Sequence, residues 1–256
     1  LTDVTGVQTC ALPIFYIDMS RDNLKTGGSC FAQVINKLGN EVPTVTDPAY
    51  FAAVFNTVQN LIVKGKILAG HDISSGGMIT TLLEMCFSNT SGGIAVNLSA
   101  LDDRDIVKIL LSQNPGIIIQ VKDENETAEI LLENGISYLS IGHPVNDRII
   151  SVTNHDNRIV FDIDHLRDVW FRSSYLLDRR QCGPEFALER FRSYSSHALR
   201  FDMQDFTGSF KSLGISPDRK KRSGIQAAII REKGVNGDRE MAYALWLAGF
   251  DVKDVH

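Results

Sequence analysis

The stretch LAGHDISSGGMITTLLEMCF, Leu68 to Phe87, places a His-Asp pair and a Gly-Gly pair between two apolar segments. The second segment, Met78 to Phe87, keeps its apolar side chains at helical spacing and predicts a helix with a wide buried face. The first, residues 66–70, predicts a short buried strand. Residues 71–77 therefore predict a loop that leaves a sheet and enters a helix.

Four properties of this loop favour a phosphate and metal site. Asp72 at a strand end offers carboxylate oxygens, which magnesium prefers as ligands. Gly76 and Gly77 let the backbone approach a phosphate without a Cβ in the way. Ser74 adds a hydroxyl donor, and the N-terminus of the following helix favours an anion. The loop is thus a candidate nucleotide site.

A purely structural interpretation fits the same residues. Asp72 or Ser74 could cap the helix, because Asp and Ser are common helix N-caps. Gly76 and Gly77 could then simply turn the chain, and His71 is interpreted as a hydrogen-bonded structural histidine. The loop alone does not decide between the two interpretations.

Strand and helix patterns alternate on both sides of the loop and predict an α/β (α+β) fold with helices packed on a mixed sheet. Asp47-Pro48 predicts the start of a helix that ends at Gly65. Strands are expected at 15–19, 66–70, 93–98, 116–121, 137–145, 148–154 and 158–163, and helices at 30–38, 48–64, 78–87, 101–113, 124–135, 165–181 and 184–194.

The last third of the chain changes character. Residues 195–223 are polar, contain three Gly or Pro interruptions and end in the basic run DRKKRS, which predicts a linker. Residues 225–232 then predict a buried strand, 239–250 a helix and 251–256 a second strand. About thirty residues are too few to bury a core of their own, so this βαβ unit is expected to be the cut start of a further domain.

Composition excludes several classes of function. A net charge of −5 argues against a general nucleic-acid binder, and the apolar runs are shorter than a membrane helix requires. Cys10, Cys30, Cys86 and Cys182 form no zinc-ligand spacing and predict reduced thiols in a cytoplasmic protein.

Residues 1–14 resemble a translated sequencing adapter and are expected to lie outside the fold. The chain is therefore expected to be a fragment of a longer protein.

Three segments carry a family resemblance in a fixed order. HDISSGGMITTLLEMCFS resembles the HDxSDGG-helix motif of the phosphoribosylformylglycinamidine synthase family, in its large single-chain form. LKTGGSCFAQV resembles its LGGxxxAQV segment, and AAIIREKGVNGDREMAYALWLAGFDVKDVH resembles the opening of its glutaminase domain. Ser75 departs from the usual aspartate and Thr26 from the usual leucine.

The resemblance implies an ATP-dependent C–N ligase of purine biosynthesis. That family converts formylglycinamide ribonucleotide, glutamine and ATP to formylglycinamidine ribonucleotide, glutamate, ADP and phosphate. It implies Mg²⁺ on Asp72, nucleotide (ATP or ADP) contacts from Ser74, Gly76 and Gly77, and glutaminase Cys, His and Glu beyond the chain end. The fragment would hold no catalytic residue and be inactive alone, with the missing remainder of the polypeptide as its partner.

The resemblance also implies the domain organisation. Residues 15–164 would form the C-terminal α/β domain of the second synthetase half, an aminoimidazole-ribonucleotide-synthetase-like domain. Residues 165–223 would form a helical segment and linker, and 224–256 the truncated glutaminase start. The rival interpretations are another enzyme with the same domain, such as aminoimidazole ribonucleotide synthetase, selenophosphate synthetase or thiamine-phosphate kinase, and a non-catalytic binding module.

Overall fold

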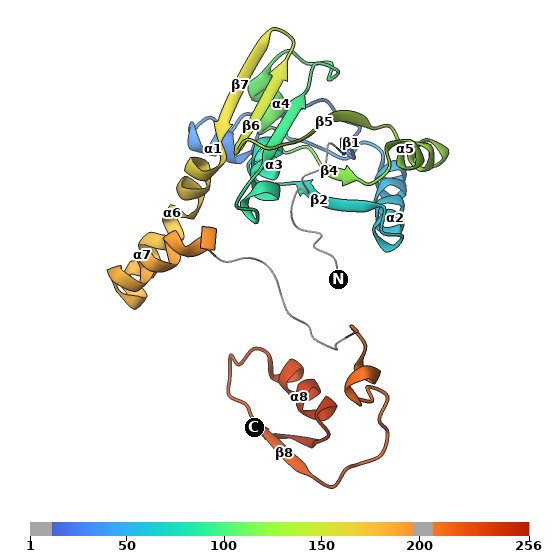
Figure 1. Ribbon diagram of the computed structural model, residues 1–256, viewed down its shortest axis with the longest axis vertical. Helices are drawn as coiled ribbons and strands as arrows, with labels where there is room; N and C mark the ends of the chain where they lie inside the picture. The colour runs from blue at the N-terminus through green and yellow to red at the C-terminus, as the bar shows by residue number, and fades with distance from the viewer. Residues whose placement is uncertain (1–11, 197–206, 256) are drawn as a thin grey trace. The chain divides into compact units, whose positions relative to one another are not determined.

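The computed structural model describes residues 12–196 and 207–255, which belong to two compact units (Figure 1). The first unit is built on one seven-stranded sheet and the second on one parallel strand pair. No helix within the described ranges is long and apolar enough to cross a membrane.

The large sheet is mixed, with the strand order β2-β4-β1-β5-β3-β6-β7. Only β3 and β6 run parallel, and every other neighbouring pair is antiparallel. The predicted mixed sheet with helices packed on it is confirmed. The strands are β1 (Ile14–Asp18), β2 (Ile67–Ile73), β3 (Gly93–Asn97), β4 (Gly116–Val121), β5 (Leu139–Val145), β6 (Ile149–Asn154) and β7 (Asn157–Asp162).

Helices cover both faces of this sheet, and β1 shows why. Its side chains alternate, so Ile14 and Tyr16 enter one core while Phe15 and Ile17 enter the other. The helices of this unit are α1 (Cys30–Val34), α2 (Pro48–Val63), α3 (Gly77–Phe87), α4 (Ile106–Leu111), α5 (Glu124–Glu133), α6 (Ile163–Cys182) and α7 (Pro184–Arg192), followed by the short 3₁₀ turn Ser193–Ser196.

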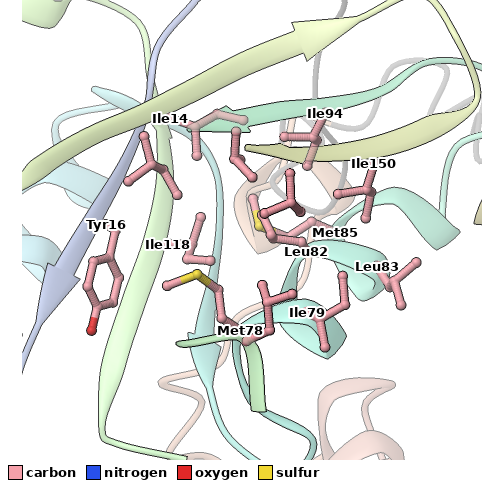
Figure 2. Close-up of a cluster of buried hydrophobic side chains, with 14 of the residues drawn as sticks. Ile14, Tyr16, Met78, Ile79, Leu82, Leu83, Met85, Ile94, Ile118 and Ile150 are labelled. Atoms are coloured by element: carbon pink, nitrogen blue, oxygen red, sulfur yellow. The ribbon is translucent and has the colours of Figure 1, made fainter. Parts of the chain in front are cut away.

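The first core lies between the sheet and α3, α4 and the start of α6. Figure 2 shows the apolar face of α3 directed at the side chains of the strands. The six α3 residues that the spacing predicted to be apolar and inward, Met78, Ile79, Leu82, Leu83, Met85 and Cys86, are all buried.

The second core lies under α2 and α5. Asp47 caps α2 by accepting a hydrogen bond from the Tyr50 N–H, as predicted, and Gly65 with φ +64° follows its C-terminus. The helical spacing of the apolar residues in α2 predicts that Phe55 and Ile62 face the core, but both are exposed, while Thr57 is buried.

Several boundaries differ from the sequence prediction. The strand expected at 66–70 covers Ile67–Ile73, so His71 and Asp72 belong to β2 and not to the predicted loop. The helix expected at 30–38 ends at Val34, and the one expected at 101–113 covers only Ile106–Leu111. Asp105 starts the latter late because its carboxylate accepts from two backbone N–H groups of the first turn, and Ser112 is already extended. The domain boundary predicted at 164 falls inside α6, whose first residue Ile163 is fully buried in the first core.

The start of the chain requires a correction. Residues 1–11, with Cys10, lie outside the described residues. Ile14, however, was expected to pack against nothing and is fully buried, opposite Gln120 of β4. The Pro13 carbonyl accepts a hydrogen bond from the Val121 N–H at 3.1 Å. The packed structure therefore includes Pro13 and Ile14, because Ile14 extends the alternating apolar pattern of β1.

The second unit holds β8 (Gln226–Ile230), α8 (Asp238–Leu247) and β9 (Asp251–Val255), preceded by the 3₁₀ turn Phe210–Leu213. The predicted strand-helix-strand order is confirmed, and β8 and β9 pair in parallel. The expectation that β8 is buried is wrong: none of residues 207–255 is buried, and Ile230 is 80% exposed. Among residues 207–255 α8 is the only α-helix against the two strands, which leaves much of their apolar surface exposed.

Candidate functional site

The predicted loop lies at an edge of the seven-stranded sheet, since β2 has β4 as its only neighbour in it. Asp72 is the second-last residue of β2, opposite Ile117, and its side chain is 73% exposed. Ser74 and Ser75 follow in an exposed turn, and α3 begins at Gly77. The structure thus brings the predicted site residues together on one strand-turn-helix segment.

The capping interpretation is wrong. The N-cap of α3 is Gly76, with φ +90° and no side-chain hydrogen bond. Neither the Asp72 carboxylate nor the Ser74 hydroxyl bonds to the first turn of α3. The polar side chains of this loop are therefore not needed to start the helix, and the Asp72 carboxylate is free to face a ligand.

The backbone of Asp72 is held firmly. Its carbonyl oxygen accepts a hydrogen bond from Thr81 Oγ1 at 3.0 Å, and His71 Nδ1 lies 2.7 Å from the same oxygen. His71 Nε2 lies 3.0 Å from Glu84 Oε2 on α3. Both ring nitrogens of His71 thus lie within hydrogen-bonding distance of acceptor oxygens, which agrees with its structural interpretation.

Packing alone explains both glycines of the loop. A Cβ on Gly76 would lie 2.2 Å from Thr80 Oγ1, and one on Gly77 would lie 2.6 Å from the Leu110 carbonyl oxygen. Both have positive φ, at +90° and +74°. The N–H of Gly77 donates to the Ser74 carbonyl at 3.0 Å, so this donor is not available to an anion. A role for either glycine in binding a nucleotide stays a prediction.

The donor set fits magnesium only in part. Within residues 12–196 and 207–255, no three His, Cys, Asp or Glu side chains gather as a metal site. Asp72 can supply one oxygen ligand, since its carboxylate is exposed and its nearest basic group is His71 Nδ1 at 3.5 Å from Oδ1. Further ligands would have to come from phosphate oxygens, water or another part of the polypeptide.

A second glycine loop, residues 26–29, precedes α1. Ser29 caps α1 by accepting from the Ala32 N–H, and a Cβ on Gly27 would lie 2.1 Å from the Glu41 carbonyl oxygen. Sequence reasoning identified this loop only through the family resemblance. It did not identify Gln113, whose side chain lies between the two loops. A lone glutamine between a helix and a strand carries no pattern that could have revealed it.

A cavity of 620 Å³ lies apart from the predicted loop. Its walls carry five carboxylates and two lysines, which pair as Lys25–Asp22 at 2.7 Å and Lys108–Asp103 at 2.9 Å. Each lysine, by hydrogen bonding, lowers the pKa of its aspartate partner. The lining residues are Tyr16, Asp18, Asp22, Asn23, Leu24, Lys25, Glu41, Leu101, Asp102, Asp103, Lys108, Ser137, Tyr138 and Leu139. The excess of carboxylates makes this cavity a poor match for a phosphate.

The fold and the site define an α/β domain whose edge strand ends in an exposed carboxylate, Asp72, with a hydrogen-bonded backbone, just before a helix. Residues 20–154 match the family described as AIR synthase related protein, C-terminal domain. The chain belongs to this family.

The wider comparison confirms the resemblance to the phosphoribosylformylglycinamidine synthase family. The probable phosphoribosylformylglycinamidine synthase, chloroplastic/mitochondrial, of Arabidopsis thaliana is 31% identical over 251 residues. The alignment takes in 94% of this chain and 17% of that relative. The chain thus spans about a sixth of the length of this relative.

Solved structures confirm the fold. PurL of T. maritima complexed with ATP superposes with a TM-score of 0.50 at 13% identity, over 65% of this chain and 27% of that one. The same protein complexed with FGAR gives a TM-score of 0.51 at 14% identity, over 65% of this chain and 29% of that one. Identities this low support a shared fold and no further conclusion.

Proposed function

We propose that this chain is part of a phosphoribosylformylglycinamidine synthase, an ATP-dependent C–N ligase of purine biosynthesis. The observation that carries the proposal is the alignment with the Arabidopsis protein over 94% of the chain. The remaining 6% is too short to contain residues 207–255, so the match extends into the β8–α8–β9 segment. An enzyme that shared only the first domain, such as aminoimidazole ribonucleotide synthetase, would not account for that extension.

In this proposal the seven-stranded unit, from Ile14 to the start of α6, forms the α/β domain of the second synthetase half. The rest of α6 and the residues up to 223 form the helical segment and linker, and 224–256 the start of a glutaminase domain. Glutamine would be the nitrogen donor, formylglycinamide ribonucleotide the acceptor, and the rest of the polypeptide the partner. The protein would act in the cytoplasm. The chain alone would be inactive, because the glutaminase Cys, His and Glu would lie beyond it.

The edge loop would bind a nucleotide, ATP or ADP. Asp72 would give magnesium one carboxylate oxygen, and the ion would neutralise charge on the phosphates. Ser74, exposed in the turn, would donate its hydroxyl to a phosphate oxygen, and Gly76 and Gly77 would keep that turn close to the ligand. Thr81 and His71 would hold the Asp72 backbone so that its carboxylate keeps one direction.

The test compares Asp72→Asn with Asp156→Asn in the complete synthase polypeptide. Both changes remove one carboxylate charge, but Asp156 lies exposed in the β6–β7 turn. We expect Asp72→Asn to lose most bound nucleotide and ATP-dependent amidine formation, with glutamine hydrolysis and the thermal midpoint preserved. Asp156→Asn should match the parent. Parent-like nucleotide content and synthetase activity in Asp72→Asn would refute the metal role of Asp72 and favour the non-catalytic module.

A further inference from the structure

Gln113 lies in the connection between α4 and β4, half-buried. Its side-chain amide oxygen accepts hydrogen bonds from the backbone N–H of Cys30 at 2.9 Å and of Gly76 at 2.8 Å. These two donors assign the orientation of the amide, because its nitrogen has no lone pair to accept them. One oxygen therefore serves two backbone donors from distant parts of the sequence.

The two donors belong to the two glycine loops. Cys30 is the first residue of α1, directly after loop 26–29, and Gly76 is the N-cap of α3, two residues after Ser74. Helix starts leave backbone N–H groups without partners inside the helix. Gln113 satisfies one such group in each loop and so fixes the distance between them.

The segment that carries Gln113 is itself well anchored. The neighbouring Asn114 is 2% exposed, and its amide nitrogen donates to Ser20 Oγ at 3.2 Å and to the Asn23 carbonyl at 3.0 Å. Its amide oxygen accepts from the Lys25 N–H at 3.0 Å. The α4–β4 connection thus fastens the loop of residues 20–25 as well.

The chain from Leu110 to Ser112 also packs closely against the start of α3. The carbonyl oxygens of Leu110 and Ser112 lie where a Cβ on Gly77 would be only 2.6 and 2.8 Å away. The contacts of Asn114 and this close packing therefore hold the backbone of Gln113 in place. The Gln113 side-chain amide then keeps its position even if either loop moves.

We propose that Gln113 is a positioning residue for the site: it holds the TGGS loop and the Asp72–Gly77 loop at one fixed separation, so that a single ligand meets both. This inference rests on the proposed nucleotide function of the Asp72 loop. Gln113 acts through the backbone of Cys30 and Gly76 and contacts no ligand. Fixing two loops before binding removes part of the ordering cost that the ligand would otherwise have to overcome.

The decisive variants are Gln113→Leu and Gln113→Glu, with Gln59→Leu as control. Leucine has a similar size and no acceptor, whereas glutamate keeps an acceptor at the same reach. Gln59 is an exposed glutamine on α2. In the complete synthase we expect Gln113→Leu to raise the KM for ATP by about five- to tenfold, the effect of about one hydrogen bond. Gln59→Leu should stay within about twofold of the parent. Gln113→Glu keeps an acceptor for both loops but adds a negative charge near the proposed phosphate site, so its informative readout is the protection of the two backbone N–H groups and not the KM.

Amide hydrogen exchange separates this inference from the proposed function. Gln113→Leu should lose protection at both Cys30 and Gly76, and Gln113→Glu should retain it. If Asp72→Asn is parent-like while protection is still lost in Gln113→Leu, the loop contact stands and the assigned nucleotide is wrong. Unchanged protection in Gln113→Leu overturns the inference. A lowered thermal midpoint with an unchanged KM in Gln113→Leu also overturns it, because Gln113 would then have only a structural role.

Discussion

The sheet of β1 to β7 has helices on both faces, whereas within residues 207–255 the β8–β9 pair has α8 as its only α-helix partner. Both regions follow the same local rules of strand pairing and helix capping. The first nevertheless encloses two apolar clusters, and none of residues 207–255 is buried. The difference shows that correct local structure does not make a core, because an apolar strand is stabilised only when both of its faces are covered.

Truncating one leucine in each region should give the largest contrast. Leu82 of α3 is fully buried, and Leu245 of α8 is half-buried. We expect Leu82→Ala to lower the free energy of unfolding by about 2–5 kcal/mol, and Leu245→Ala by less than about 1 kcal/mol. Urea unfolding of both variants, followed by circular dichroism, measures this. Equal losses would show that the second region has a core of its own.

Adding a methyl group to one glycine in each region should give a smaller contrast. Gly77 and Gly234 both have positive φ, +74° and +88°, but only Gly77 has backbone atoms within 3 Å of a Cβ position. Gly234→Ala should cost only the left-handed strain of about 1–2 kcal/mol. Gly77→Ala should cost about 1–3 kcal/mol more through overpacking. Denaturation midpoints that shift equally would contradict the close packing of α3 against the α4–β4 connection.

The smallest effect is a pH dependence in the second region. The backbone N–H groups of Ser223 and Gly224, and next Arg219, hold the pKa of Asp251 below its usual 3.8. A lowered folded-state pKa stabilises the fold above pH 3.8, and this stabilisation is lost as the pH falls through the lower value. Carboxyl NMR titration should place the midpoint of Asp251 below 3.8, and Arg219→Gln should raise it only in part. A midpoint in Arg219→Gln equal to the usual value would show that the backbone donors contribute nothing.

Sequence patterns predicted the elements well where one residue carries a local signal. Asp47-Pro48 marked the start of α2, and the spacing from Met78 onward marked the buried face of α3. Both depend on interactions within a few residues, which a single sequence displays. The burial of Ile14 was missed because its partners lie on β4 and β5, more than a hundred residues away.

The candidate site likewise combines residues that a local sequence pattern reveals with one residue, Gln113, that only long-range contacts reveal. Asp72, Ser74, Gly76 and Gly77 were predicted because they are close in sequence and chemically distinctive, and their role in binding a ligand stays a prediction. Whether Asp72 or Ser74 caps α3 required the position of the N-cap, which the structure places at Gly76. Gln113 could not be found, since its contacts with Cys30 and Gly76 exist only after α4 has packed beside both loops. Long-range hydrogen bonds of this kind leave no spacing in the sequence.

The sheet order has a consequence for synthesis of the protein on the ribosome. The central strand β1, with the apolar run IFYI, finds its first partner only when β4 is complete, about a hundred residues later. At about 5–20 residues per second, that interval lasts roughly 5 to 20 s. Throughout it an unpaired, aggregation-prone strand is exposed. The nascent chain is therefore expected to depend on chaperones that bind β1 until residue 121 has emerged.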